Sequence, residues 1–224
     1  MAKKLLLVSV VLTVLALAGS SALALAPMGP PTAGLKTGQF RVGIEYAYSD
    51  LDMELDGEEL DGVTSNMIFG NLGYGIMDDW EAFVRLGVAN ADIEDGDFSG
   101  DYGFAWGLGT KVTFLKQENL NWGALFQITW MNSEDEDVEI DAYDMQIAVG
   151  PTWKLSDTLS IYGGPFVHLI DGEVSDGNGD LEEDSAFGGY VGAEAALAEN
   201  TSLFGEFQFT GAGWAIGTGI NWKF

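Results

Sequence analysis

The side chain in this sequence most capable of proton transfer is His168, the only histidine among 224 residues. Its imidazole titrates near neutral pH, so it could act as a general acid or base. A transfer partner must lie within hydrogen-bond reach. The surrounding segment, Phe166-Val-His-Leu-Ile-Asp171, offers an aspartate but no neighbouring serine or second acidic cluster. The pattern therefore favours a structural histidine and a protein without enzymatic activity. A surface hydrolase using His168 is the less favoured alternative.

A second possible site is the run Asp176-Gly-Asn178-Gly-Asp180, which begins like a calcium-binding EF-hand loop with oxygen ligands at alternate positions. Leu181 stands where the sharp turn requires glycine, and Phe187 stands where a bidentate glutamate belongs. The run is therefore not an EF-hand. Its acids are weak candidates for loosely bound calcium or magnesium, and no other cofactor is predicted. Cysteine is absent, which excludes disulfides and thiolate metal sites.

Most of the 35 acidic residues gather in four segments that contain no Lys or Arg: 50–62, 92–101, 133–142 and 171–184. Such segments concentrate cations and repel anions over a distance set by the salt concentration. A solvated acidic rim, suited to saline surroundings, is the alternative interpretation. The formal net charge of −26 argues against a nucleic-acid partner, because a phosphate backbone requires a basic surface.

Between these acidic segments, apolar and small or polar residues alternate with the two-residue period of a β-strand. The period predicts ten strands of a length that suits tilted membrane-spanning strands. Met67 and Phe69 compete with Ile68 and Leu72 for the apolar face of one strand, so its orientation stays open. The predicted strands cover about residues 39–49, 63–76, 80–90, 102–114, 121–130, 143–155, 159–170, 185–197, 202–210 and 214–224.

Short and long connections follow one another in turn, and aromatic side chains gather at both strand ends. Both features are typical of an up-and-down transmembrane barrel. The predicted fold is therefore all-β: a closed antiparallel barrel of ten strands, with eight as the alternative. A soluble lipocalin-like barrel would direct its large apolar residues inward, which is the reverse of the pattern found here.

The face opposite the apolar one carries a nearly balanced set of charges. Charges inside a membrane protein must pair or contact water, so this layer is either a salt-bridged filling or the wall of a narrow wet path. Ten strands with further inward aromatics favour a mostly filled lumen. The predicted lumen layer consists of Arg41, Glu45, Glu81, Arg85, Lys111, Asp144, Lys154, Glu194, Glu206 and Lys223.

The N-terminus has the features of an export signal. Lys3 and Lys4 precede an apolar run, and small residues then offer A-x-A cleavage sites. The predicted organisation is a signal peptide over residues 1–24, with cleavage possible at 26. A flexible periplasmic leader over 25–38 and a barrel domain over 39–224 follow.

The chain resembles the small β-barrel proteins of the Gram-negative outer membrane, OmpA/OmpX-like or porin-like. The resemblance rests on the signal peptide, the ten alternating segments and the ending Asn221-Trp222-Lys223-Phe224. It implies that Trp222 and Phe224 form the signal read by the barrel assembly machinery. It also implies an outer-membrane location, with long loops outside and both termini in the periplasm.

This architecture hosts many functions, so the resemblance indicates architecture better than activity. The expected function is structural or narrow porin-like, favouring cations through the acidic loops. The alternative is an adhesion or ligand-binding barrel acting through segments 50–62 and 171–184. The expected partners are outer-membrane lipid, lipopolysaccharide and the assembly machinery, and the barrel is expected to be a monomer.

Overall fold

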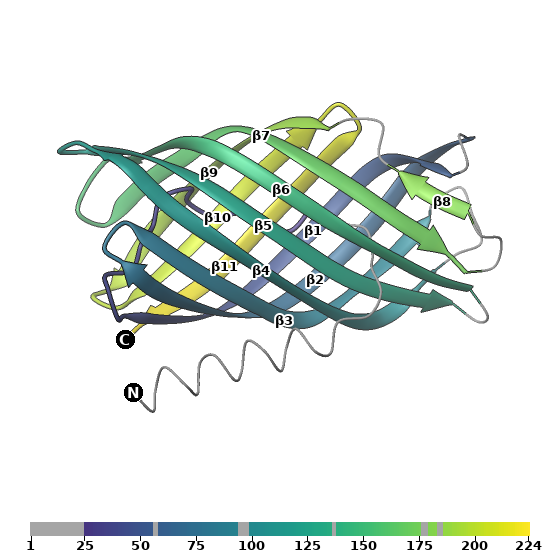
Figure 1. Ribbon diagram of the computed structural model, residues 1–224, viewed down its shortest axis with the longest axis horizontal. Helices are drawn as coiled ribbons and strands as arrows, with labels where there is room; N and C mark the ends of the chain where they lie inside the picture. Colours follow the sequence, from purple (N-terminus) through teal and green to yellow (C-terminus); the bar gives the residue numbers. More distant parts are fainter. Residues whose placement is uncertain (1–24, 56–57, 94–98, 136–137, 176–178, 183–185) are drawn as a thin grey trace.

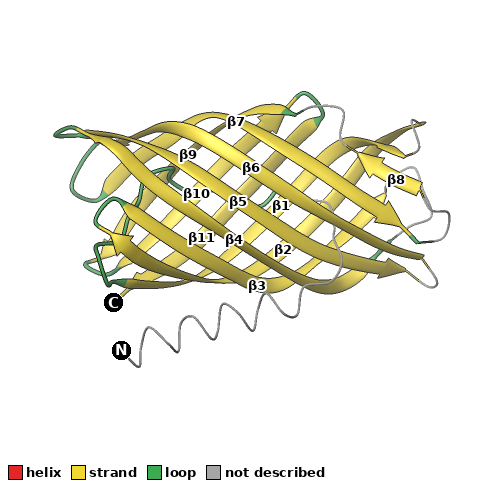
Figure 2. Ribbon diagram, viewed as in Figure 1, coloured by secondary structure: helices red, strands yellow, loops and turns green. Residues whose placement is uncertain are grey.

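The computed structural model describes residues 25–224 except 56–57, 94–98, 136–137, 176–178 and 183–185. All regular secondary structure in the described part is β-strand (Figure 2). No helix there is long and apolar enough to cross a membrane. The strands are β1 (Phe40–Leu55), β2 (Glu58–Met77), β3 (Trp80–Ile93), β4 (Asp101–Lys116), β5 (Leu120–Asp135), β6 (Val138–Lys154), β7 (Leu159–Val174), β8 (Gly179–Glu182), β9 (Phe187–Ala198), β10 (Thr201–Thr210) and β11 (Gly213–Lys223).

Ten of these strands, β1–β7 and β9–β11, form a closed antiparallel barrel in up-and-down order (Figure 1). The barrel closes where β1 pairs with β11, from Arg41 opposite Lys223 to Leu51 opposite Gly213. Closure leaves no unpaired edge among these strands. The prediction of a ten-stranded barrel is confirmed.

Side chains alternate between the outer surface and the lumen along each strand, as the pleat requires. Large apolar side chains such as Ile44, Val191 and Phe207 are exposed on the outside. The orientation of β2 is now decided: Met67 and Phe69 are buried in the lumen, whereas Ile68 is exposed. The outer surface is therefore apolar over the body of the barrel, as a lipid-facing wall requires.

The barrel has two unlike ends. We call the end with the connections 78–79, 117–119, 155–158 and 199–200 the turn end, and the opposite one the loop end. Strands at the loop end run further than predicted, because acidic residues there alternate with apolar ones, as in Asp50-Leu-Asp-Met-Glu-Leu55. Segments 50–62 and 133–142, expected as long loops, are therefore largely extended hairpins.

Strand β8 was not predicted, and it changes the barrel at the loop end. Its backbone pairs on one side with β7, from Asp171 to Val174, and on the other with Glu54 and Leu55 of β1. At the loop end β8 thus lies between β7 and β1. Nearer the turn end, β9, β10 and β11 lie between those two strands, and these three strands do not extend as far toward the loop end. The wall of ten strands becomes a ring of eight, made of β1–β7 and β8.

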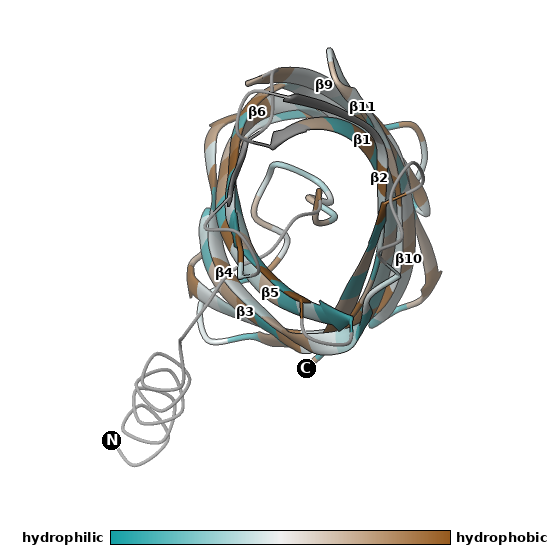
Figure 3. Ribbon diagram, turned by 90° about the vertical axis from the view of Figure 1, so that its right-hand side faces the viewer, coloured by the Kyte–Doolittle hydropathy of each residue, from teal (hydrophilic) through white to brown (hydrophobic). Residues whose placement is uncertain are grey.

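Residues 25–38 are not a leader outside the barrel. Figure 3 shows this part of the chain inside the ring of strands, and Leu25, Ala26, Met28 and Leu35 are almost completely buried. The expectation of a flexible leader fails because the lumen offers this segment polar partners that its sequence pattern does not reveal. We call residues 25–35 the plug.

Candidate functional site

The plug enters the barrel at the turn end and runs toward the loop end. At residue 38 the chain pairs with the end of β2, where the Gly38 N–H donates to the Gly75 carbonyl at 2.8 Å. Ten residues earlier, Met28 is fully buried in the lumen. The plug has no regular secondary structure, so its backbone groups must find partners on the wall.

Two carboxylates each receive a pair of the plug's N–H groups. Met28 N and Gly29 N donate to the two oxygens of Glu206, each at 2.7 Å. Gly34 N and Leu35 N both donate to Glu81 Oε2, at 2.7 and 3.1 Å. Gly29 has a φ of +65°, a left-handed conformation that glycine adopts without strain. Charge-assisted bonds of this kind are about twice as strong as neutral ones.

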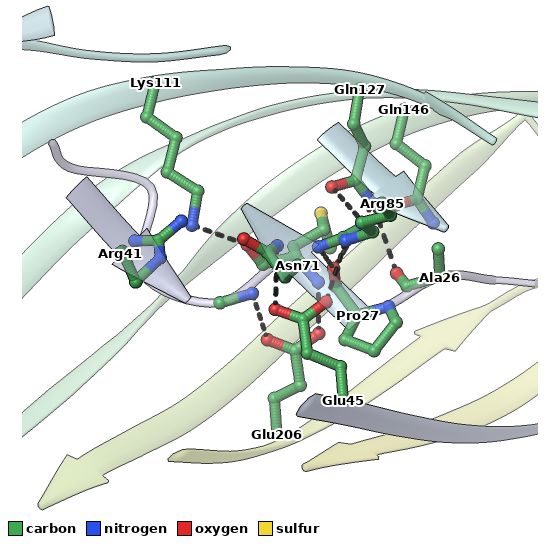
Figure 4. Close-up of polar contacts among 12 residues, drawn as sticks. Ala26, Pro27, Arg41, Glu45, Asn71, Arg85, Lys111, Gln127, Gln146 and Glu206 are labelled. Atoms are coloured by element: carbon green, nitrogen blue, oxygen red, sulfur yellow. Dashed lines mark hydrogen bonds and ion pairs between the residues drawn. The ribbon is translucent and has the colours of Figure 1, made fainter. Parts of the chain in front are cut away.

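Cationic and amide side chains receive the plug's carbonyl groups (Figure 4). Arg85 donates through a short bond to the Pro27 carbonyl, and Lys111 Nζ donates to the Met28 carbonyl at 2.8 Å. The Ala26 carbonyl accepts from Gln127 and Gln208, at 3.3 and 2.9 Å. The plug is therefore held by both its donors and its acceptors.

Two buried ion pairs fix the wall around the plug. Arg41 pairs with Glu81 at 2.9 Å, and Arg85 pairs with Glu45 at 2.8 Å. The second pair is extended by Asn71, whose amide donates to Glu45 at 3.1 Å. Buried charges need such partners because desolvation costs several kcal/mol per ion. Glu81 and Arg85 each serve both an ion pair and the plug.

The other charges of the predicted lumen layer lie around this centre. Asp144 is buried and accepts from Ala26 N at 3.5 Å. Glu194 accepts from the Ser202 hydroxyl at 2.7 Å. Lys223 donates to the Gly34 carbonyl at 3.2 Å, and Lys154 is exposed at the turn end. Six of the ten charges thus contact the plug directly, and two more, Arg41 and Glu45, reach it through Glu81 and Arg85. The remaining two, Lys154 and Glu194, line a cavity beside the plug.

A cavity of about 260 Å³ remains between the plug and the wall in the turn-end half. Plug residues Met28, Gly29 and Gly34 form one side of it. The barrel contributes Arg41, Glu45, Asn71, Arg85, Lys111, Lys154, Ser160, Glu194, Asn221 and Lys223.

The loop-end half of the lumen has a different lining. Apolar side chains from β1, β2, β5, β6 and β7 fill it and belong to one buried cluster, which also includes Leu25 at the tip of the plug. We call the wall residues the loop-end cluster: Leu51, Met53, Val63, Met67, Met131, Ile140 and Ile170. Because Leu25 and Ala26 belong to the same buried cluster, the plug contributes to the packing of this half as well.

His168 lies in the lumen, buried, with its ring 5.2 Å from that of Phe166. Asp171, expected nearby, belongs to the opposite face of β7, where Tyr143 Oη donates to it at 3.3 Å on the outer surface. The structure therefore separates the two residues that a hydrolase would have to combine.

The weak calcium candidates cannot be placed. Asp176 and Asn178 lie outside the described residues, and only the backbone of Asp180 is described, in β8. The described side chains include no group of three or more His, Asp or Glu able to hold a metal ion.

The final strand meets the first at the turn end. Phe40 N donates to the Phe224 carbonyl at 3.1 Å, and Phe224 N donates to the Phe40 carbonyl at 2.8 Å. Trp222 is half-buried, whereas the Phe224 side chain is exposed on the outside. Both aromatic residues thus stand at the closing seam of the barrel.

Sequence analysis missed the plug and the loop-end cluster for different reasons. The cluster had a signal, because apolar residues alternate with acids in segments 50–62 and 133–142. The plug gave no such signal, because the run Pro27-Met-Gly-Pro-Pro31 has no periodicity and contains no polar side chain. It is held through its backbone, which sequence patterns do not show.

Comparison with known families places this barrel among bacterial membrane proteins. Residues 79–219 match the model of the outer membrane protein β-barrel domain. The chain belongs to this family. It is therefore an outer-membrane β-barrel protein, and no curated protein matches its sequence.

Solved structures agree on the fold. An outer membrane channel from Pseudomonas putida F1 is similar with a TM-score of 0.53 and 12% identity, over 90% of this chain and 100% of that one. The translocator domain of the autotransporter NalP from Neisseria meningitidis gives a TM-score of 0.50 and 12% identity, over 85% and 90%. At such identities the likeness shows the barrel fold alone.

Proposed function

We propose that this protein is a narrow porin-like channel of the outer membrane, closed by its own N-terminal segment. The observation that carries the proposal is the plug, whose backbone bonds to Glu81, Glu206, Arg85 and Lys111 inside the lumen. A barrel serving only as a structural anchor could fill its lumen with wall side chains, as small barrels do. A separate segment that contacts the wall mainly through backbone hydrogen bonds, which water can replace, is instead suited to leave.

The open form favours cations. Five basic and five acidic side chains make up the lumen layer, so the wall itself is balanced. Departure of the plug uncovers the Glu81 and Glu206 carboxylates together with Arg85 and Lys111, so the wall stays balanced. The preference comes from the acidic segments at the loop end, whose negative field raises the local cation concentration.

The proposal includes an orientation and partners. The acidic loop end faces the exterior, where bound divalent cations can connect it to lipopolysaccharide phosphates, and the turn end with both barrel termini faces the periplasm. The Trp222 and Phe224 seam is the segment that the assembly machinery reads.

The protein acts as a monomer without enzymatic activity, so His168→Ala should leave conductance unchanged and abolish no hydrolysis of peptide or lipid substrates.

Planar-bilayer recording tests the proposal on a variant that joins residue 24 directly to residue 36. We expect a conductance at least tenfold above that of the intact protein and a reversal potential that shows preference for cations. Migration of unboiled against boiled protein on a denaturing gel controls for folding. A folded deletion variant that conducts no better than the intact protein would exclude the plug as the gate.

A disulfide lock is the matched control. The hydroxyls of Thr32 in the plug and Thr152 in β6 lie 2.8 Å apart, and the chain has no cysteine. Thr32→Cys with Thr152→Cys should give a channel that is shut when oxidised and recovers intact-protein openings after reduction. Equal openings in both redox states would mean that ions pass without movement of the plug.

A further inference from the structure

The turn-end cavity is lined by an excess of positive charge. Arg41, Arg85, Lys111, Lys154 and Lys223 face it, against Glu45 and Glu194 as the acidic lining residues. Arg41 and Lys111 lie close together beside the plug in Figure 4. Like charges held together away from bulk water repel each other unless an anion stands between or beside them.

Among the described residues, the two arginines have carboxylate partners within 4 Å and the lysines have none, although Glu81 and Glu45 attract Lys111 from a greater distance. Arg41 and Arg85 pair with Glu81 and Glu45. Lys111 is only 5% exposed, and among the described residues no carboxylate lies within 4 Å of its ammonium group. Its contacts are the Met28 carbonyl at 2.8 Å and the Phe83 ring at 5.7 Å. One carbonyl and a ring face compensate a buried ammonium charge only in part.

Free donors in the same cavity complete the site. The Nε of Arg41 has no hydrogen-bond partner among the described residues, although the side chain is about nine-tenths buried. The Asn221 amide and the Ser160 hydroxyl line the cavity as well. A planar guanidinium combined with lysine ammonium groups is the donor set that recognises phosphate and carboxylate oxygens.

We propose that this cavity binds a small, multiply charged oxyanion, with Arg41 and Lys111 as the inner ligands and Lys154 and Lys223 at the rim. The rim lysines stand at the turn end, so the anion enters from that side. Inorganic phosphate and small dicarboxylates share the required chemistry: two or more negative charges on oxygens within reach of several cationic donors.

The anion stabilises the closed channel. Met28, Gly29 and Gly34 of the plug line the cavity, so the site is complete only while the plug is seated. A ligand that binds one of two states shifts the equilibrium toward that state. This inference therefore rests on the proposed function, and it assigns to the plug a chemical signal that holds it in place.

The test uses the folded full-length barrel in detergent, titrated with inorganic phosphate or with succinate at constant ionic strength against chloride. Calorimetry measures binding, and channel openings in the same buffers measure closure. The matched variants are Lys111→Met, which removes the buried charge, and Lys116→Met, which removes an exposed lysine that donates to the Asp78 carbonyl outside the cavity. Lys154→Gln is a second variant, at the rim, in case Lys111→Met fails to fold.

We expect saturable binding of at least one of the two anions, weakened tenfold or more by Lys111→Met, severalfold by Lys154→Gln and not by Lys116→Met. The anion that binds more tightly shows whether the site prefers phosphate or a dicarboxylate. Absence of saturable binding, or equal binding by all variants, would overturn the inference. If the plug-deletion variant conducts but the intact barrel binds no anion, this inference alone is contradicted. If the intact barrel binds the anion but the plug-deletion variant does not conduct, the proposed channel is contradicted.

Discussion

The two halves of this lumen have the same strand alternation but are closed by different chemistry. In the turn-end half, charged wall residues meet the backbone of the plug through ion pairs and hydrogen bonds. In the loop-end half, the wall supplies apolar side chains that pack against one another and against Leu25. The contacts in the first half are polar and can be exchanged for water, whereas those in the second are apolar and include Leu25 of the plug itself.

The difference follows from what each half must fill. Ten strands enclose more space than the wall side chains of the turn-end half occupy, so a second segment fits there. In the loop-end half β11 still pairs with β1 as far as Leu51, and the side chains of the loop-end cluster occupy the space inside. The wall side chains therefore decide where a movable plug can lie.

The largest effect should come from placing a charge in the loop-end half. Met131→Lys buries an ammonium in the loop-end cluster with the Ser65 hydroxyl as its one identified polar neighbour among the described residues, which should lower the free energy of unfolding by about 3–5 kcal/mol. Urea titration followed by gel mobility measures the loss. Met131→Leu, which nearly conserves volume, should cost less than about 1.5 kcal/mol. Equal stability of the lysine variant would mean that this half is hydrated.

A comparable but smaller loss should follow from breaking an ion pair in the turn-end half. Arg85→Met leaves Glu45 buried without its cation and removes the donor to the Pro27 carbonyl. We expect a loss of about 3 kcal/mol in the free energy of unfolding. Glu45→Gln in the same chain should recover part of it, because no unpaired charge is left. A double-mutant cycle without coupling would contradict the pairing.

A change at Glu206 should loosen the plug, although Glu206 also accepts from Tyr162 Oη at 3.1 Å and from Gln208 Nε2 at 2.9 Å on the wall. In Glu206→Gln, one oxygen and one amide replace the two oxygens that accept from Met28 N and Gly29 N. Hydrogen bonds to charged groups contribute about 1.5–3 kcal/mol, so the plug should leave about tenfold more often or more. Single-channel open probability measures this. Glu194→Gln is the control and should keep the intact-protein value, because Glu194 accepts a hydrogen bond from the Ser202 hydroxyl and not from the plug.

The smallest effect should be a pH dependence at the plug's entrance. Hydrogen bonds from Thr37, first from its N–H and then from its hydroxyl, hold the pKa of Asp78 below its ordinary value of 3.8. Because the pKa of Asp78 is lower in the folded protein than in the unfolded chain, these bonds stabilise the folded state fully at pH values above the unfolded-state pKa. The stabilisation is lost as the pH falls through the folded-state pKa. Below about pH 4, pepsin cleavage near residue 37 should therefore rise relative to the cleavage of an unfolded reference peptide at the same pH. In Asp78→Asn that rise should be absent.

Sequence alone determined the barrel wall. A two-residue period is fixed by backbone geometry, so Arg41, Glu81 and Lys111 could be assigned to the lumen face from parity. The outward apolar face and the closing β11 strand follow from the same rule. The acidic alternation in segments 50–62 and 133–142 also carried a strand signal, although it was interpreted as loop.

Only the tertiary structure decided what fills the lumen inside the wall. Pairing of Arg41 with Glu81, or of Arg85 with Glu45, depends on strand tilt and register around a closed ring, which parity does not contain. The bridge made by β8 joins strands that are distant in sequence. Residues 25–35 are bound through backbone N–H and C=O groups, which every sequence possesses. Their place in the lumen therefore exists only once the barrel is closed around them.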